Sequence, residues 1–221
     1  MRCDAVIFDL DGTLIDTKEL ILESFRRATR EVLGTRPRDE EVLGYIGIPL
    51  IEQVSIIAPD HVEELMESYQ RHNSALHDDL IGSFKGTPEM LATLRRQGRL
   101  LGVVTSKRTK PARRGLDSFD LSPYFEVVMG MEDSEKHKPD PVPLLSAAGR
   151  LGVDPYRCAY VGDSIYDMQA ARGAKMVAIA AMWGMHTPAQ LREAGAMLEA
   201  WKPADICTVI EAYEAGDGQA S

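Results

Sequence analysis

The 221-residue chain is poor in cysteine and has no long apolar run. Its cysteines, Cys3, Cys158 and Cys207, are odd in number and show no CxxC spacing, which argues against a disulfide framework or a zinc ribbon. We expect unpaired thiols in a reducing compartment. No stretch approaches the ~20 apolar residues of a membrane helix, and no leader pattern opens the sequence. These absences predict a cytoplasmic protein without a membrane segment.

Basic residues are also scarce relative to acidic ones. Lysine and arginine number 25 against 34 aspartate and glutamate residues, for a formal net charge of −9. Broad nucleic-acid binding usually requires a basic patch, so we expect no nucleic-acid partner. A small anionic substrate is compatible with this balance, because a few local cations can bind it. The five histidines show no zinc spacing, so we expect them at the surface or in packing roles.

Strand and helix patterns alternate along most of the chain. The strands are expected to be continuous apolar runs, which is typical of parallel strands covered on both faces. Amphipathic segments between them predict helices, including one capped by Thr87 that begins at Pro88. The sequence therefore predicts an α/β fold, a Rossmann-type parallel sheet with helices on both faces. Its strands are expected at residues 4–10, 100–105, 125–130, 158–163 and 176–180, with a last short strand near 205–209.

A helical insert is expected at residues 16–84. Asp16 and Glu19 have the spacing of an N-terminal capping box, and Gly34 ends the helix that follows. Further amphipathic segments fill the rest of the insert, and its interior carries no strand pattern of similar strength. We therefore predict a core made of residues 1–15 and 85–221, which the insert interrupts.

Polar residues gather where the predicted strands end. In open parallel sheets, ligands bind at the carboxyl ends of the strands. The first strand ends in two acids spaced one residue apart, and a glycine follows them. A lysine in the segment "KHKPDP" comes just before a helix and is expected at the same edge. The side chains that we expect to converge there are Asp9, Asp11, Thr105, Ser106, Lys138, Asp163 and Asp167.

This set of residues suits phosphoryl transfer at a magnesium ion. Carboxylate oxygens are preferred Mg²⁺ ligands, and an aspartate can attack phosphorus to form an aspartyl-phosphate. A second acid can protonate the leaving group and then deprotonate water. We expect the cation to offset the repulsion between Asp9 and Asp11, while Gly12 permits the tight turn beside the ligand. Thr105 and Lys138 could hold phosphate oxygens.

The same segments resemble the haloacid dehalogenase superfamily over nearly the whole chain. "DLDGT" resembles its first motif, "VVT" its second, the lysine of "HKPDP" its third and "GDSIYD" its fourth, in the expected order. The resemblance implies a helical cap domain between the first two motifs, which agrees with the insert inferred from periodicity. Dehalogenases of the superfamily lack the second aspartate, so Asp11 favours phosphate chemistry.

The resemblance also implies roles for the acids of the first and fourth motifs. Asp9 would be the nucleophile, and Asp11 would be the general acid and base. Mg²⁺ would be held by Asp9, by the backbone carbonyl of Asp11 and by Asp163. Asp167 would orient Lys138 or a metal-bound water.

The phosphate itself would be bound by residues of the second and third motifs. By the same resemblance, the Thr105 side chain, the Ser106 backbone amide and Lys138 would contact it. The segment 43–50, "LGYIGIPL", is expected to approach this site from the insert, because its glycines permit close contact.

The substrate and two alternatives stay open at this point. Within the superfamily the chain is similar to the phosphoglycolate phosphatase group, and "SYQRHNSALHDDLI" is similar to bacterial pyrophosphatases of that group. The same scaffold could serve a phosphomutase acting on a sugar phosphate. A non-enzymatic phospho-accepting module is disfavoured, since its aspartate would follow the third strand. The candidate cations for a second phosphate are Arg71, Lys85, Lys107 and Arg108.

Overall fold

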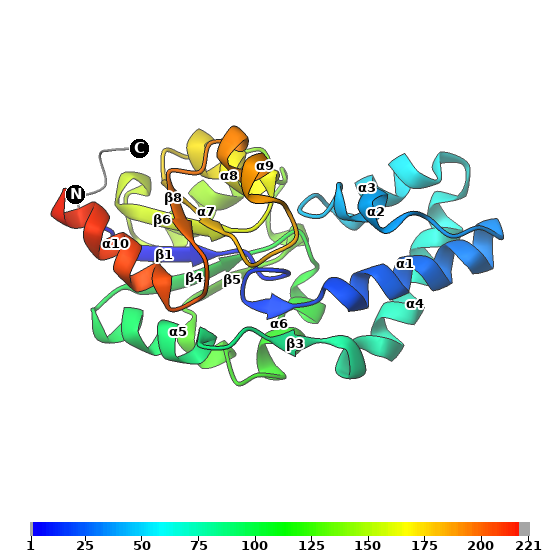
Figure 1. Cartoon of the computed structure of the whole chain (residues 1–221), viewed down its shortest axis with the longest axis horizontal. Coiled ribbons are helices and arrows are strands. Elements are labelled where there is room, and N and C mark those ends of the chain that lie inside the picture. The colour runs from blue at the N-terminus through cyan, green and yellow to red at the C-terminus, as the bar shows by residue number, and fades with distance from the viewer. Residues whose placement is uncertain (1, 217–221) are drawn as a thin grey trace.

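The structure is a computed structural model that describes residues 2–216. Its centre is a six-stranded, fully parallel sheet in the order β5-β4-β1-β6-β7-β8 (Figure 1). The α/β prediction is therefore confirmed. The strands of this sheet are β1 (Ala5–Phe8), β4 (Leu100–Val104), β5 (Val127–Met129), β6 (Cys158–Gly162), β7 (Val177–Ala181) and β8 (Leu198–Ala200).

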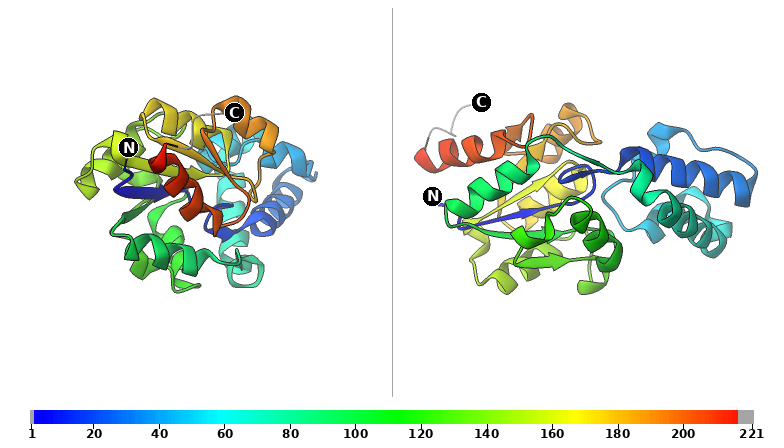
Figure 2. Two further views of the ribbon diagram at one scale, coloured as in Figure 1. Left: turned by 60° about the vertical axis from the view of Figure 1, so that its left-hand side comes forward. Right: turned by 90° about the horizontal axis from the view of Figure 1, so that it is seen from below.

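Helices cover both faces of the sheet (Figure 2). Side chains alternate along β1, so Val6 and Phe8 pack into one apolar layer while Ala5 and Ile7 pack into the other. Because both layers are buried, every position of β1 must be apolar, as the sequence pattern indicated. The covering helices are α5 (Thr87–Arg96), α6 (Thr109–Asp117) and α10 (Asp205–Ala215) on the first face, and α7 (Val142–Leu151), α8 (Ile165–Gly173) and α9 (Pro188–Ala194) on the second.

The helical insert stands beyond the carboxyl ends of the strands (Figure 1). It buries a separate apolar cluster that includes Phe25, Val54 and Leu65, so its helices pack chiefly on one another. The first helix ends at Gly34, whose φ of 68° is left-handed, as predicted. The helices of the insert are α1 (Lys18–Leu33), α2 (Asp39–Leu43), α3 (Leu50–Ile57) and α4 (Val62–Leu80).

Two short strands join the insert to the core. The chain leaves through β2 (Ile15–Asp16) and returns through β3 (Gly82–Ser83), and the two pair antiparallel. The exit and the return therefore lie side by side, which places the insert against one edge of the site. The exact division at residues 16 and 84 stays a prediction.

Two predicted helix caps are wrong. Asp16 lies in β2, and its carboxylate accepts from the Lys18 amide at 3.2 Å, while no side chain caps α1. The N-cap of α1 is Thr17, one residue later than predicted, so Asp16 and Glu19 do not occupy the N-cap and N3 positions of a capping box. The N-cap of α5 is Gly86 with φ of 93°, and Thr87 is the first helical residue. A left-handed glycine turn replaces the side-chain cap there.

The strand predicted at 205–209 is also wrong, because this segment opens α10. Ile206 and Ile210 are four residues apart and both are fully buried, so they form one helical stripe on the sheet. A short apolar run does not distinguish strand from helix until its partners are known. The last strand is β8, which precedes α10. Among the residues described, no helix is both long and apolar enough to cross a bilayer.

Candidate functional site

Three buried acids meet at the carboxyl ends of β1 and β6. Asp9 follows β1, Asp163 follows β6, and Asp167 lies in the first turn of α8. One carboxylate oxygen from each lies within 4.8 Å of the others, and all three residues are buried. We refer to Asp9, Asp163 and Asp167 as the acid cluster. Carboxylates so close in a buried site repel unless a cation neutralises them.

Lys138 supplies part of that neutralisation. Its Nζ donates to Asp167 Oδ1 at 2.7 Å and to the Tyr160 hydroxyl at 3.2 Å. It also lies 3.0 Å from Asp9 Oδ1, an ion pair whose angles fall outside hydrogen-bond geometry. The Tyr160 hydroxyl donates in turn to the Val104 carbonyl at 3.0 Å. Lys138 is thus fixed between two acids, with almost no contact with solvent.

Asp163 is oriented by neighbouring donors and by two glycines. The Thr13 hydroxyl donates to its Oδ1, and the Met185 amide donates to its Oδ2, both at 2.8 Å. A Cβ on Gly12 would lie 2.3 Å from Asp163 Oδ2, and one on Gly184 would lie 2.1 Å from Asp163 Cβ. Gly12 also has φ of 81°, so the turn after β1 needs glycine for both space and conformation.

Burial dominates the electrostatics of the acid cluster. It raises the pKa of Asp9 to about 7, against an opposing effect of Lys138, while Asp167 and Asp11 raise it further. Burial likewise raises the pKa of Asp163 well above its usual range, with help from Asp167 and Asp9. For Lys138, burial works to lower the pKa, but Asp167 and Asp9 outweigh it and the pKa is raised.

The acid cluster is therefore short of positive charge. Three carboxylates share one buried ammonium, and Asp9 Oδ1 accepts no hydrogen bond from the described residues. Hard divalent cations bind carboxylate oxygens in this kind of setting. The residues present fit a divalent cation at the acid cluster.

Asp11 lies outside the acid cluster and has a lysine of its own. Lys107 Nζ donates to Asp11 Oδ1 at 2.8 Å, and both side chains are largely buried. We expected a divalent cation to offset the repulsion between Asp9 and Asp11, and lysines already bring positive charge to both acids. Lys138 faces Asp9 and Lys107 faces Asp11, so each acid has a separate counter-charge.

Thr105 and Ser106 lie at the end of β4, beside the acids. Thr105 is buried, and its hydroxyl accepts from the Lys107 amide at 3.2 Å. The Ser106 hydroxyl donates to the Gly47 carbonyl at 2.6 Å, so this side chain ties the insert to the core. A Cβ on Gly47 would lie 2.6 Å from Ser164 Oγ, which shows how closely the 43–50 loop approaches.

A cavity of about 590 Å³ joins the site to the insert. We refer to it as the insert cavity. Asp9, Asp11, Thr105 and Ser106 line its core side, and helices α3 and α4 contribute to the opposite side. Any substrate that reaches Asp9 through this space must therefore contact the insert.

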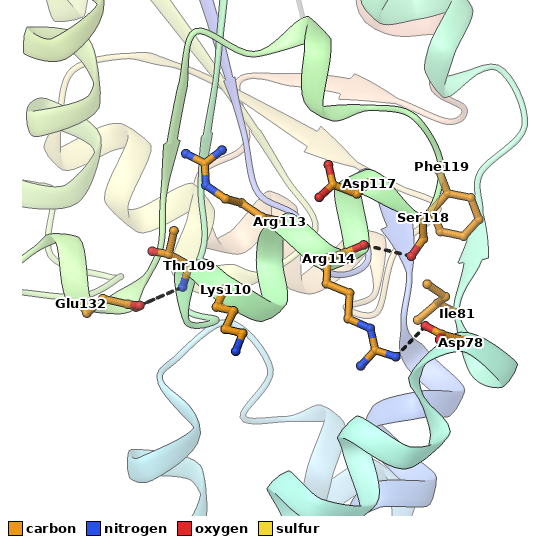
Figure 3. A pocket seen from close by; sticks show the side chains of 10 residues that line it. All are labelled: Asp78, Ile81, Thr109, Lys110, Arg113, Arg114, Asp117, Ser118, Phe119 and Glu132. Carbon is orange, nitrogen blue, oxygen red and sulfur yellow. Dashed lines mark hydrogen bonds and ion pairs between the residues drawn. The ribbon is translucent and has the colours of Figure 1, made fainter.

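A larger groove lies on the outer side of α6 and is unrelated to the acids (Figure 3). Its volume is about 990 Å³, but Asp9, Asp163 and Lys138 do not line it. Side chains of both charges line it, and Arg114 is paired with Asp78 at 2.8 Å (Figure 3). Volume alone is a poor guide here, and the insert cavity is the candidate active site.

Of the four candidate cations for a second phosphate, two line the insert cavity. Lys107 and Arg108 lie on its core side. Arg71 is instead paired with Glu31 within the insert, at 2.5 Å, and neither it nor Lys85 lines the cavity. The sequence could not show which of the four cations line the cavity, because it does not show how the insert is oriented on the core.

Two supporting residues were not predicted from the sequence. Thr13 follows Gly12 directly, so its place in "DLDGT" could have identified it as a neighbour of the acids. Tyr160 carries no such signal, since a tyrosine in a buried strand reads as packing. Of the histidines, His77 and His186 are buried and the others are not, and His77 also lines the insert cavity.

Comparison with known proteins assigns these features to a group of hydrolases. Residues 6–181 match the family of haloacid dehalogenase-like hydrolases. The chain is 36% identical over 174 residues to pyrophosphatase PpaX of Halalkalibacterium halodurans, covering 79% of this chain and 81% of that protein. It is 36% identical over 203 residues to pyrophosphatase PpaX of Bacillus cereus strain B4264, covering 92% and 91%.

The fold is shared with solved structures as well. A predicted phosphoglycolate phosphatase from Haemophilus somnus superposes with a TM-score of 0.86, covering 95% of this chain and 98% of that one. At 23% sequence identity, this similarity is evidence for a shared fold alone. The match extends over the insert as well as the core.

Proposed function

The chain belongs to the haloacid dehalogenase-like hydrolases, and we propose that it is a Mg²⁺-dependent phosphatase acting through an aspartyl-phosphate. The observation that carries the proposal is the placement of Asp9 at the acid cluster and beside Lys138, at the inner end of the insert cavity. The substrate class is a small phosphorylated compound. The pyrophosphatase relatives make pyrophosphate the first compound to test, and phosphoglycolate the second.

In the first step, an Asp9 carboxylate oxygen attacks phosphorus. The bond between phosphorus and the leaving oxygen breaks, and Asp11 donates a proton to that oxygen. Asp11 is placed for this role because it lines the insert cavity together with Asp9. Lys138, Thr105 and the Ser106 amide would hold the phosphoryl oxygens in line.

In the second step, water releases the phosphate. Asp11, now ionised, accepts a proton from the water, whose oxygen attacks phosphorus. The bond between phosphorus and Asp9 breaks, inorganic phosphate leaves, and both acids return to their starting states. The pair of acids on one turn thus serves both halves of the reaction.

A magnesium ion would be held by Asp9, Asp163 and the Asp11 backbone carbonyl. When bound, it supplies charge neutralisation for the phosphoryl group. Asp167 is committed to Lys138 and to the Ser164 amide, which donates to its Oδ2 at 2.9 Å, so we assign it a positioning role. Gly12 and Gly184 leave the space that this arrangement needs around Asp163.

Mg²⁺ is expected to stabilise the protein, and more strongly as the pH rises. The raised pKa of Asp9 means that the metal-free fold loses stability as pH rises from about 4 to about 7, because the folded state holds the proton longer. Cation binding requires ionised acids, so bound Mg²⁺ offsets this loss of stability mainly above about pH 7. Saturating Mg²⁺ should raise the melting temperature by at least about 5 °C at pH 8 and by much less at pH 5.

The matched variants for this measurement are Asp163→Asn and Asp79→Asn. The first removes a proposed ligand and should abolish the thermal shift. Asp79 is exposed on α4 in the insert, so its variant should retain the shift. An equal shift in both variants would place the ion elsewhere.

A phosphate-release screen tests the function directly. Purified protein is offered pyrophosphate, phosphoglycolate and several sugar phosphates, with Mg²⁺ or with excess EDTA. We expect Mg²⁺-dependent release from at least one of them. Conversion of a sugar phosphate to its isomer without release would instead indicate a phosphomutase, and no turnover of any phosphorylated compound would contradict the proposal.

A further inference from the structure

We propose that the preferred substrate is an organic phosphate monoester whose leaving group presents an extended apolar surface to the insert. The inference rests on the proposed phosphatase function and names the substrate class more closely. It departs from the pyrophosphate suggested by the relatives, whose leaving group is itself a charged phosphate. The insert cavity carries the argument.

Part of the insert's side of the cavity is an apolar wall. Six aliphatic or thioether side chains of the insert line it, and the insert's polar lining residues, Gln53, Tyr69, Gln70, Asn73, Ser74 and His77, come chiefly from α4. Ile51 remains 41% exposed, so its side chain is free to contact a ligand in the cavity. The six are Ile21, Ile46, Ile48, Leu50, Ile51 and Met66.

The insert contributes neither lysine nor arginine to the described lining of the cavity. In the described part of the chain, the cations that line it, Lys107, Arg108 and Arg114, all come from the core. Lys107 is already paired with Asp11, and Arg114 is paired with Asp78. Of the three, Arg108 alone has no ion pair among the described residues, so a second phosphate placed against the insert would lose hydration and gain few charged partners.

The apolar wall is held in place before any substrate binds. The Gln53 amide donates to the Ile48 carbonyl at 2.9 Å, and the Ser106 hydroxyl donates to the Gly47 carbonyl at 2.6 Å. These bonds fix the loop that carries Ile46 and Ile48 from both the insert and the core. A preformed apolar wall favours a complementary ligand, since little ordering is required on binding.

The size of the insert cavity agrees with an organic leaving group. At about 590 Å³ it lies within the range of pockets that enclose drug-sized molecules. Pyrophosphate would occupy only the end near Asp9 and leave the apolar wall in contact with water. Size, lining and charge thus favour the same class of ligand.

The test compares n-alkyl phosphates from ethyl to hexyl phosphate with pyrophosphate. Their alcohols leave with nearly equal ease, so chain length changes apolar contact and little else. We expect kcat/KM to rise by about fourfold for each methylene that becomes buried. Ile51→Lys should lower kcat/KM for hexyl phosphate by at least about tenfold and leave ethyl phosphate nearly unchanged.

Ile56→Lys is the matched control. Ile56 lies on the same helix and is 50% exposed, but it does not line the insert cavity, so its variant should behave like the wild type. Ile51→Ala is the milder second variant. If Ile51→Lys melts early, the alanine variant should still flatten the dependence on chain length.

The outcomes separate the two proposals. A flat alkyl series with pyrophosphate as the best substrate would overturn the inference and leave the phosphatase function standing. A lack of Mg²⁺-dependent phosphate release from every compound would overturn the function itself. Equal effects of lysine at positions 51 and 56 would also count against the apolar wall.

Discussion

Asp9→Asn should lower Mg²⁺-dependent phosphate release by at least about 10³-fold. The amide is a poor nucleophile toward phosphorus and cannot form the aspartyl-phosphate. It also removes one of the charges proposed to bind the metal. The loss should therefore appear in kcat and persist at saturating substrate, as measured in steady-state assays on the best compound from the phosphate-release screen.

The fold should survive this change. Asparagine has the size of aspartate, and Asp9 is one of three buried acids that share a single lysine, so removing its charge relieves repulsion. The melting temperature without Mg²⁺ is expected to match or exceed that of the wild type. Asp16→Asn, at the exposed position of β2, is the control and should stay within about twofold in activity. Substantial activity in Asp9→Asn would exclude Asp9 as the nucleophile.

The convergence of the site residues was predictable because it follows from topology. Parallel strands present their carboxyl ends at one edge, so residues that end different strands must meet there. Asp9, Asp163 and Thr105 each follow a strand that the apolar pattern identified. The lysine at 138 follows no predicted strand directly, and its position just before a predicted helix placed it at the same edge.

Only part of the pairing within the site could be read from the sequence. The resemblance implied that Asp167 orients Lys138, but nothing in the sequence indicated that Lys107 reaches Asp11 over 96 positions. Such contacts depend on which rotamers the packing permits. Tyr160 was missed for the same reason, whereas the 43–50 loop, which lines the insert cavity, was expected to approach the site.

The errors in the fold arose in short segments. In α10, the buried residues Ile206 and Ile210 stand four apart, yet the five-residue run that begins the helix also resembles a strand. The true final strand, β8, contains only Leu198–Ala200 and includes a glutamate, so its pattern is too short to detect. Tertiary pairing with β7 decides both assignments.

Lys138→Met should destabilise the fold by about 3–5 kcal/mol. Methionine fills the space of the lysine stem but leaves Asp9 and Asp167 without their buried counter-charge. Because both acids are almost fully buried, water cannot replace the lysine at low cost. The free energy of unfolding, taken from urea titrations without Mg²⁺, measures the effect.

Lys136→Met is the matched control, two residues away. Lys136 is paired with Asp140 at 2.9 Å but is largely exposed, so its loss should change the free energy of unfolding by less than about 1 kcal/mol. Adding Asp167→Asn to Lys138→Met should restore part of the lost stability, since it removes one of the two stranded charges. If the lysine variants at 136 and 138 were equally stable, Lys138 would not be the counter-charge of the acid cluster. If the double variant were less stable than Lys138→Met alone, Asp167 would be held by its bonds to Ser164 rather than by charge.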